Sequence, residues 1–519
     1  MSERIYIFDT TLRDGAQMEG VTFSLEDKLD IISRLDSLGV DFIEGGMPMS
    51  NPTDTKLFRK LPDSKAKVTA FGSTIRPGSS ADTDPGLRNL VESDAEWVCI
   101  FGKSWRFHLN KVLRISDKEN LRMIRDSIEY LKFSGKKVIF DAEHFFDGYK
   151  DDRDFALDVV RTAYDAGADW VCLCDTNGGC LPGQISDAVK DVKASCDARI
   201  GIHCHNDSDM AVACSLAAVD AGARMVQGTI NGLGERCGNA NLCSVIPNLV
   251  FKMGYETCMD LTKLTGASYA ISDIANKHQD PSLPYVGSRA FTHKGGMHID
   301  ALIKDPHTYE HITPEMVGNH RTLIVSELTG KAGISKKLEE LGVKNTPENV
   351  NKVLAMIKNM EGDGYQFEAA DASLELLIRR ECEGLEKPFS VPVFRIFMDE
   401  TGDYEIKSEA SIKVKDMEGH IEHTAADGNG PVDALSNALK KALSTFFPVI
   451  TKIRLIDYKV RVLDEKAATA APVRVMVRTT DGKCQWNTVG VSTNVIEASF
   501  IALLDAVEYA VFKHTEKVN

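Results

Sequence analysis

Residues 5–15 read Ile-Tyr-Ile-Phe-Asp-Thr-Thr-Leu-Arg-Asp-Gly, and an amphipathic run follows at 25–38. This order predicts a first strand, a loop over 9–15 and a first helix. At the end of a strand, the carboxylate of Asp14 can hold a hard divalent metal while the guanidinium of Arg13 neutralises an oxyanion beside it. An isolated Arg-Asp pair is more often a surface ion pair on a turn, so the interpretation depends on what the rest of the chain brings to this loop.

The same alternation of strand and helix recurs through the first half of the chain. Apolar, β-prone runs lie at 4–9, 40–45, 67–72, 96–101, 137–143, 169–175, 199–205 and 224–230. Helical patterns follow them near 24–38, 53–61, 84–93, 117–133, 153–166, 183–195, 208–221 and 240–252. Eight such pairs in about 250 residues predict a (β/α)₈ TIM barrel. A doubly wound sheet would need a phosphate-binding glycine turn after an early strand, and the glycine-rich stretch 232–238 has the wrong spacing and follows the eighth strand.

The length of 519 residues predicts further domains beyond the barrel. We expect a catalytic barrel at 1–260 and a mainly helical linker or lid at 261–390, which has Pro and Gly breaks near 280–284 and 330–333. The portion 391–519 contains an internal repeat. Helices are predicted to begin within 424–435 and 488–499, and each follows two β-like runs, at 410–416 and 420–425 and at 473–479 and 485–491. Two β-β-α units of this kind predict a small C-terminal α+β domain.

Composition excludes several classes of protein. The formal net charge is −15, and the sequence has no long basic run, which argues against nucleic acid or an anionic membrane as a partner. No apolar run approaches the roughly 20 residues that a membrane span needs, and none follows the first residue as a signal segment. The 12 cysteines are dispersed without a C-x-x-C pair, which indicates buried thiols in a reducing compartment. The sequence therefore predicts a soluble, cytoplasmic protein.

In a TIM barrel the functional residues lie at the C-terminal ends of the strands. Several predicted strands end in side chains that can bind metal or transfer protons. These are Arg13 and Asp14; Glu44; Asp141, Glu143 and His144; Asp175, Thr176 and Asn177; His203, His205, Asn206 and Asp207; and Asn231, Glu235, Arg236 and Asn239. Their concentration at one mouth predicts the active site there.

His203 and His205 are the strongest candidates for metal ligands. Side chains alternate along a strand, so both imidazoles lie on one face while Cys204 points away. With Asp14 and an amide such as Asn239, they form a mixed nitrogen and oxygen site that suits Mg²⁺, Mn²⁺, Zn²⁺ or Co²⁺. A His-x-His pair alone is as often structural, and the strand-end position beside Asp14 favours the ligand interpretation.

Four motifs carry a family resemblance. They are Phe-Asp-Thr-Thr-Leu-Arg-Asp-Gly-Ala-Gln at 8–17, His-Cys-His-Asn-Asp at 203–207, Asn-Gly-Leu-Gly-Glu-Arg-Cys-Gly-Asn-Ala at 231–240, and Phe-Thr-His-Lys-Gly-Gly-Met-His-Ile-Asp at 291–300. Together, in this order, they resemble the 2-isopropylmalate, homocitrate and citramalate synthases, which are acyl-CoA condensing members of a metal-dependent barrel family. The resemblance covers essentially the whole chain and is greatest toward the citramalate synthases.

The resemblance implies a role for each matching residue. The metal ligands would be Asp14, His203, His205 and Asn239. Arg13 would bind the 2-oxo oxygen, Thr176 would bind the substrate carboxylate, and Glu143 would complete the catalytic arrangement. The general base would be His298, with Asp300 and Tyr309 as its companions from the segment beyond the barrel. An imidazole titrates near neutrality, which suits such a base.

The implied reaction is the condensation of acetyl-CoA with pyruvate and hydrolysis of the thioester, which gives (R)-citramalate and coenzyme A for isoleucine biosynthesis. The C-terminal domain would sense isoleucine and support a homodimer, or would serve dimerisation alone. Three other functions stay open on sequence. They are a 2-isopropylmalate synthase, a retro-aldol lyase, which would not need the segment 391–519, and a catalytically inactive amino-acid sensor.

Overall fold

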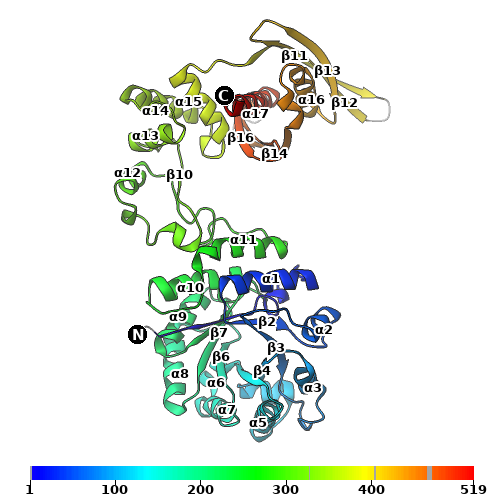
Figure 1. The fold of residues 1–519 in the computed structure, drawn as a ribbon, viewed down its shortest axis with the longest axis vertical. Coiled ribbons are helices and arrows are strands. Elements are labelled where there is room, and N and C mark those ends of the chain that lie inside the picture. Colours follow the sequence, from blue (N-terminus) through cyan, green and yellow to red (C-terminus); the bar gives the residue numbers. More distant parts are fainter. Residues whose placement is uncertain (1–2, 327, 402–404, 465–469, 519) are drawn as a thin grey trace. The chain divides into compact units, whose positions relative to one another are not determined.

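The computed structural model of the chain describes residues 3–326, 328–401, 405–464 and 470–518 (Figure 1). The chain divides into two compact units. The first comprises Met1–Phe291 and His311–Arg321, and the second comprises Thr292–Glu310 and Thr322–Asn519. The predicted division into three domains, with boundaries at residues 260 and 390, is finer than these two units and remains a prediction.

The first unit is built on a closed barrel of parallel strands. They are β1 (Tyr6–Asp9), β2 (Phe42–Gly46), β3 (Lys67–Ser73), β4 (Trp97–Lys103), β5 (Lys137–Glu143), β6 (Trp170–Asp175), β7 (Ile200–Cys204) and β8 (Met225–Gly228). β1 pairs with both β2 and β8, so the sheet closes on itself. Each strand overlaps the apolar run that predicted it, which confirms the TIM barrel.

Helices surround this barrel (Figure 1). Those that the sequence pattern predicted are α1 (Leu25–Leu38), α2 (Pro52–Arg59), α3 (Pro85–Glu92), α5 (Asp117–Phe133), α7 (Arg153–Asp165), α8 (Pro182–Ser195), α9 (Ala211–Ala221) and α10 (Leu242–Phe251). Not predicted were α4 (Arg106–His108), the π-helix Leu109–Leu113 and α6 (Phe145–Asp151), while α11 (Leu264–Ile274) lies in the stretch 261–390 that was predicted to be mainly helical. The ends of α1 show how the sequence fixes such a helix. Ser24 and Asp27 form a reciprocal capping box at its start, and Gly39 ends it with a φ of 92°.

The barrel interior is packed with large side chains. Its buried members are Phe8, Phe42, Phe71, Cys99, Ile139, Trp170 and Met225. Phe8 and Phe42 stack with ring centroids 5.7 Å apart, and Trp97 meets Phe42 edge-on at 5.0 Å. The barrel is therefore a solid core, as small barrels are, and polar side chains gather at its C-terminal mouth.

The second unit begins with two very short strands and several helices. These elements are β9 (Thr292–His293), α12 (Gly296–Lys304), β10 (Thr322–Leu323), α13 (Lys331–Glu340), α14 (Pro347–Gly362) and α15 (Asp371–Glu383). The helical character predicted for this region is present. Ile334, Val353 and Ile357 belong to the hydrophobic core that holds α13 and α14 together.

The C-terminal domain contains both predicted repeats, and each has one strand more than the sequence pattern showed. The first repeat is β11 (Phe389–Thr401), β12 (Glu405–Asp416), β13 (Ile421–Gly428) and α16 (Pro431–Ser444). The second is β14 (Arg454–Val462), β15 (Val473–Thr480), β16 (Gln485–Ser492) and α17 (Val495–Val518). β11 and β14 are edge strands of their antiparallel sheets and leave much of their surface exposed. Strands exposed in this way lack the alternation of buried and polar residues that reveals a strand in sequence.

Two features bear on the environment of the protein. In the described ranges, no helix is both long enough and apolar enough to cross a bilayer. The 12 cysteines are all free thiols. Those that are buried are Cys99, Cys172, Cys174, Cys180, Cys204, Cys214 and Cys243. The predicted burial of thiols therefore holds for the cysteines of the barrel strands.

Candidate active site

One cavity at the C-terminal mouth of the barrel collects most of the predicted residues. Its volume is about 250 Å³. It is lined by Arg13, Asp14, Gln17, Phe71, Phe101, Asp141, Glu143, Cys174, Thr176, His203, His205, Glu235 and Arg236. The loop after β1 and the ends of β5, β6 and β7 thus bring their polar side chains to a common point, as the barrel rule predicts.

Asp14, His203 and His205 form a candidate metal centre. All three are buried, and one ligand atom of each lies within 4.8 Å of the others. His203 Nε2 lies 3.3 Å from Asp14 Oδ2 and 3.3 Å from His205 Nε2. A mixed set of imidazole and carboxylate ligands suits a divalent cation.

Unsatisfied polar atoms at this centre point to the same conclusion. Among the described residues, Asp14 Oδ1, His205 Nδ1 and Asn239 Oδ1 are buried without a hydrogen-bond partner. Asn239 pairs with His205 through an isolated β-bridge, and its Nδ2 donates to Leu233 O at 3.2 Å, which leaves the amide oxygen available. Buried polar atoms are normally paired, so these residues fit a metal ion.

The electrostatics give Asp14 and His205 the protonation states that metal binding requires, whereas at His203 burial is outweighed by the neighbouring Asp14, which raises the pKa of His203. Burial alone would raise the pKa of Asp14, but the charge of Arg13 and the hydrogen bond from His203 outweigh it and hold that pKa well below its usual range. Burial and the neighbouring His203 lower the pKa of His205 to about 3. Asp14 is therefore anionic and His205 neutral at neutral pH.

Arg13 is fixed on two sides. Its Nε donates to Glu44 Oε2 at 2.6 Å, and its guanidinium lies 3.9 Å from the centroid of the Phe71 ring. Its NH1 also lies 3.3 Å from Asp14 Oδ2, so the cation borders the candidate metal centre. A guanidinium held in this way is preorganised to stabilise negative charge that develops in the cavity.

Asp9 organises the turn that presents Arg13 and Asp14. Its carboxylate accepts hydrogen bonds from Thr11 N and Thr11 Oγ1, both at 2.9 Å, while the side chain is fully buried. Burial raises the pKa of Asp9 to about 7, against the opposing effect of the bonds from Thr11. The folded protein therefore retains a proton on Asp9 between about pH 4 and pH 7 that the unfolded chain releases.

Because the folded pKa of Asp9 is raised, its contribution to stability is greatest below pH 4 and is lost as the pH rises toward 7. We expect Asp9→Asn, which keeps one of the two accepting oxygens and cannot ionise, to remove up to about 4 kcal/mol of this pH-dependent loss. Differential scanning calorimetry would show the variant gaining thermal stability relative to the unchanged protein between pH 5 and pH 8. If the difference in thermal stability between the two proteins were the same at pH 5 and at pH 8, a raised pKa at Asp9 would be contradicted.

Glu143 and Thr176 occupy the opposite wall of the cavity. Glu143 forms an ion pair with Lys103 at the end of β4. Thr176 Oγ1 accepts from His144 N at 2.9 Å, and Arg236 NH2 donates to Thr176 O at 2.8 Å. The hydroxyl proton of Thr176 thus stays available to a carboxylate bound in the cavity.

His298, Asp300 and Tyr309 belong to the second unit, so their part in the site remains a prediction. The rings of His298 and Tyr309 stack with centroids 4.1 Å apart. Asp300 pairs with Lys304 at 2.6 Å, one turn along α12. The predicted contact between His298 and Tyr309 is therefore present within this unit. The side chain of Asp300 forms an ion pair with Lys304 and not with His298.

Sequence reasoning missed some contributors and misjudged others. Gln227 on β8 bonds to His203, and Lys103 pairs with Glu143. A polar residue inside an apolar strand was the available signal for Gln227. Asn231, expected at the mouth, instead donates to Ser268 O at 2.8 Å and so secures the packing of α11.

The closed barrel and its buried candidate metal centre define a class of barrel protein, and comparison with known families identifies it. The HMGL-like family matches residues 4–271. Residues 285–364 match a homocitrate synthase post-HMGL domain-like segment, and residues 368–511 match the LeuA allosteric (dimerisation) domain.

Relatives extend the match to the full chain. An (R)-citramalate synthase of Aquifex aeolicus is 50% identical to this chain, in an alignment that covers 100% of this chain and 99% of the relative. One of Geobacter sulfurreducens is 48% identical over 99% of this chain and 98% of its own length. A 2-isopropylmalate synthase of Methanocaldococcus jannaschii is 33% identical over 97% of this chain and 94% of its own length. The chain belongs to the HMGL-like family and, within it, to the branch of the (R)-citramalate synthases.

Proposed function

We propose that this chain is a transferase that condenses acetyl-CoA with pyruvate and hydrolyses the thioester, giving (R)-citramalate and coenzyme A. The observation that carries the proposal is the buried centre of Asp14, His203 and His205 directly beside Arg13. The full-length similarity to (R)-citramalate synthases supports the choice of substrates. The product would enter isoleucine biosynthesis.

The cavity at the barrel mouth suits a small 2-oxo acid. Asp14, His203, His205 and Asn239 would hold a divalent metal, which would polarise the keto group as a Lewis acid. Thr176 binds the carboxylate, and Arg13 neutralises the charge that develops on the keto oxygen. Phe71 and Phe101, stacked 5.5 Å apart, present an apolar wall to a short alkyl group.

The condensation needs a base near the acetyl group, and we assign this role to His298 with Tyr309 and Asp300. His298 removes a proton from the acetyl methyl group, and the resulting enolate carbon attacks C2 of pyruvate. The former keto oxygen takes up a proton from water as the new carbon-carbon bond forms, and His298 returns its proton to the solvent. Water then attacks the thioester carbonyl, and coenzyme A leaves as the thiol. Glu143, beside Lys103, completes the polar wall of the cavity.

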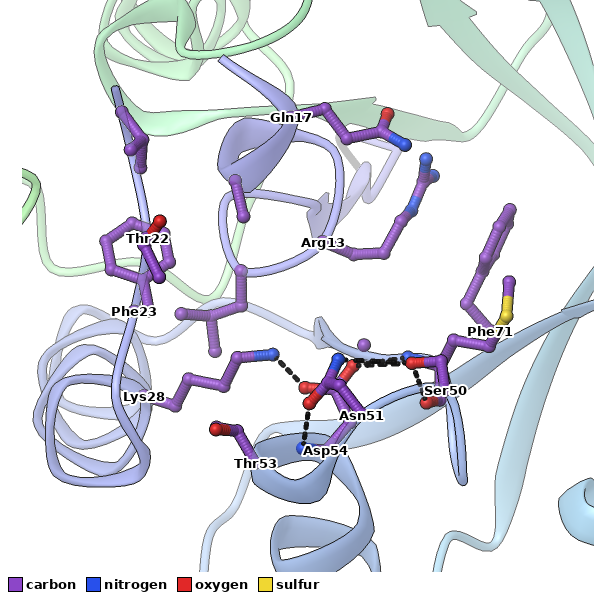
Figure 2. Close-up of a pocket in the computed structure, with 15 residues that line it drawn as sticks. Arg13, Gln17, Thr22, Phe23, Lys28, Ser50, Asn51, Thr53, Asp54 and Phe71 are labelled. Carbon is purple, nitrogen blue, oxygen red and sulfur yellow. Dashed lines mark hydrogen bonds and ion pairs between the residues drawn. The ribbon is translucent and has the colours of Figure 1, made fainter. Parts of the chain in front are cut away.

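A second cavity borders Arg13, Gln17 and Phe71 and supports acetyl-CoA as the co-substrate. Its volume is about 530 Å³. Figure 2 shows Arg13 and Gln17 on one side and Lys28 pointing to Asp54 on the other, at 2.5 Å. Its other polar side chains, among them Thr22, Ser50 and Asn51, are uncharged. Such a lining suits the neutral, amide-containing pantetheine arm of coenzyme A, which would deliver the acetyl group beside Arg13.

The C-terminal domain supports a homodimer and a feedback site for isoleucine. The match of residues 368–511 to an allosteric dimerisation domain is the main support. Exposed apolar side chains on the edge strands β11 and β14 offer surface for self-association; they include Val393, Phe397, Ile456 and Val460. The free thiols fit a cytoplasmic location.

A coenzyme A release assay across four 2-oxo acids tests this function. We expect pyruvate to exceed 2-oxobutanoate, 3-methyl-2-oxobutanoate and 2-oxoglutarate in kcat/KM, because each added methylene in a small apolar pocket changes the rate by about 10- to 200-fold. Isoleucine should lower the rate and leucine should not. A preference for 3-methyl-2-oxobutanoate would instead indicate a 2-isopropylmalate synthase, and no release with any acid would contradict a condensing enzyme.

A further inference from the structure

A buried chain of hydrogen bonds runs from the candidate metal centre into the barrel. His203 Nδ1 lies 3.0 Å from Gln227 Oε1, and Gln227 Nε2 donates to Asp141 Oδ1 at 2.9 Å. The three side chains come from β7, β8 and β5, and none is more than 4% exposed. His203 and Gln227 are register partners on adjacent strands, so the backbone of the barrel fixes their pairing.

The bond at Asp141 determines which atoms donate and which accept along this chain of hydrogen bonds. Gln227 Nε2 donates to Asp141 Oδ1, so the amide nitrogen of Gln227 faces Asp141 and the amide oxygen faces His203. An amide oxygen also only accepts, and Nδ1 of His203 must therefore carry a proton. When a metal displaces the proton that Nε2 shares with Asp14, Nδ1 keeps its own proton and Nε2 carries the lone pair that the metal would take; this atom lies 3.3 Å from both Asp14 Oδ2 and His205 Nε2.

We propose that Gln227 and Asp141 are positioning residues that hold His203 in the one tautomer whose Nε2 can bind the metal. Partners of this kind orient metal-binding imidazoles and raise their basicity. His205 has no such support, since its Nδ1 has no partner among the described residues. His203 is thus the anchored ligand of the pair, and His205 can adjust to the ion.

Packing alone does not explain this pair of polar side chains. Ile139 and Met225, two residues before Asp141 and Gln227 on the same strands, are buried in the barrel interior. The interior therefore accepts apolar side chains at adjacent levels, and burying an amide and a carboxylate is unfavourable unless their hydrogen bonds serve a purpose. The role proposed here rests on the metal centre of the proposed function.

Binding of Mn²⁺, measured by titration calorimetry on the full chain stripped of metal, tests the proposal. In Gln227→Met, which keeps the length of the side chain but removes the acceptor, we expect the Kd for Mn²⁺ to rise about 10- to 100-fold. In Asp141→Asn the new side chain can donate as well as accept, so the orientation of the Gln227 amide is no longer fixed. The Kd for Mn²⁺ should therefore rise in this variant as well. Thr69→Val is the matched control, because Thr69 is equally buried on β3 and its hydroxyl donates to Lys67 O, away from the candidate metal ligands. Its Kd should not change.

Circular dichroism and thermal unfolding of the metal-free variants separate this role from a structural one. A lower Tm with an unchanged Kd for Mn²⁺ would assign Gln227 and Asp141 to the core and overturn the proposal. If Gln227→Met does not fold, the Kd of Asp141→Asn decides. Failure of the unchanged protein to bind Mn²⁺ would instead count against the metal centre itself, and so against the proposed function.

Discussion

His205→Ala is expected to reduce coenzyme A release with pyruvate by about 10³-fold or more, because a Lewis acid contributes several kcal/mol to the stabilisation of developing charge. Removing metal with EDTA should produce the same loss in the unchanged protein. His205 is buried, and its Nδ1 has no hydrogen-bond partner among the described residues, so its loss breaks no hydrogen bond at that atom. The rate of coenzyme A release and the bound metal per chain, measured together, check this result.

His423→Ala provides the matched control, since His423 is an exposed histidine on β13 that bonds to Ser411 Oγ and lies in the second unit. Its rate and metal content should match those of the unchanged protein. Restoration of activity after EDTA by Mn²⁺, Mg²⁺, Co²⁺ or Zn²⁺ would identify the ions that serve the enzyme. Undiminished release in His205→Ala, or in EDTA, would remove the metal from the mechanism.

The barrel was predictable because its strands are buried on both faces. Such strands read as short, continuous apolar runs, and the polar residues that end them mark one mouth of the barrel. Asp14, His203 and His205 were found in this way, from the position of each at a strand end. In the structure one ligand atom of each lies within 4.8 Å of the others, and their role as metal ligands stays a prediction.

The partners of these residues were less accessible to sequence reasoning. The bond from Arg13 to Glu44 depends on the register that sets Phe8 beside Phe42, and a shift by one residue would turn Glu44 to the other face of the sheet. Gln227 offered no periodic signal, since β8 is short. α6 was missed for a similar reason, because its 7 residues are too few to show a helical period.

The second large effect is expected at Arg13. Arg13→Lys keeps the positive charge but cannot both bond Glu44 and lie over Phe71, so the donors facing the cavity lose their fixed position. We expect kcat for coenzyme A release to fall about 10²- to 10³-fold, the usual effect of losing one preorganised donor to a developing oxyanion. Bound metal should be retained, because Arg13 is not one of the predicted ligands, and this separates the variant from His205→Ala.

Arg34→Lys is the control for the exchange of arginine for lysine. Arg34 lies on the exposed face of α1 and pairs with Asp30 across one helical turn, an interaction that contributes little. Its kcat should remain unchanged. If Arg13→Lys instead kept its kcat and raised only the KM for pyruvate, Arg13 would bind substrate and transition state equally, and the charge on the former keto oxygen would need another partner.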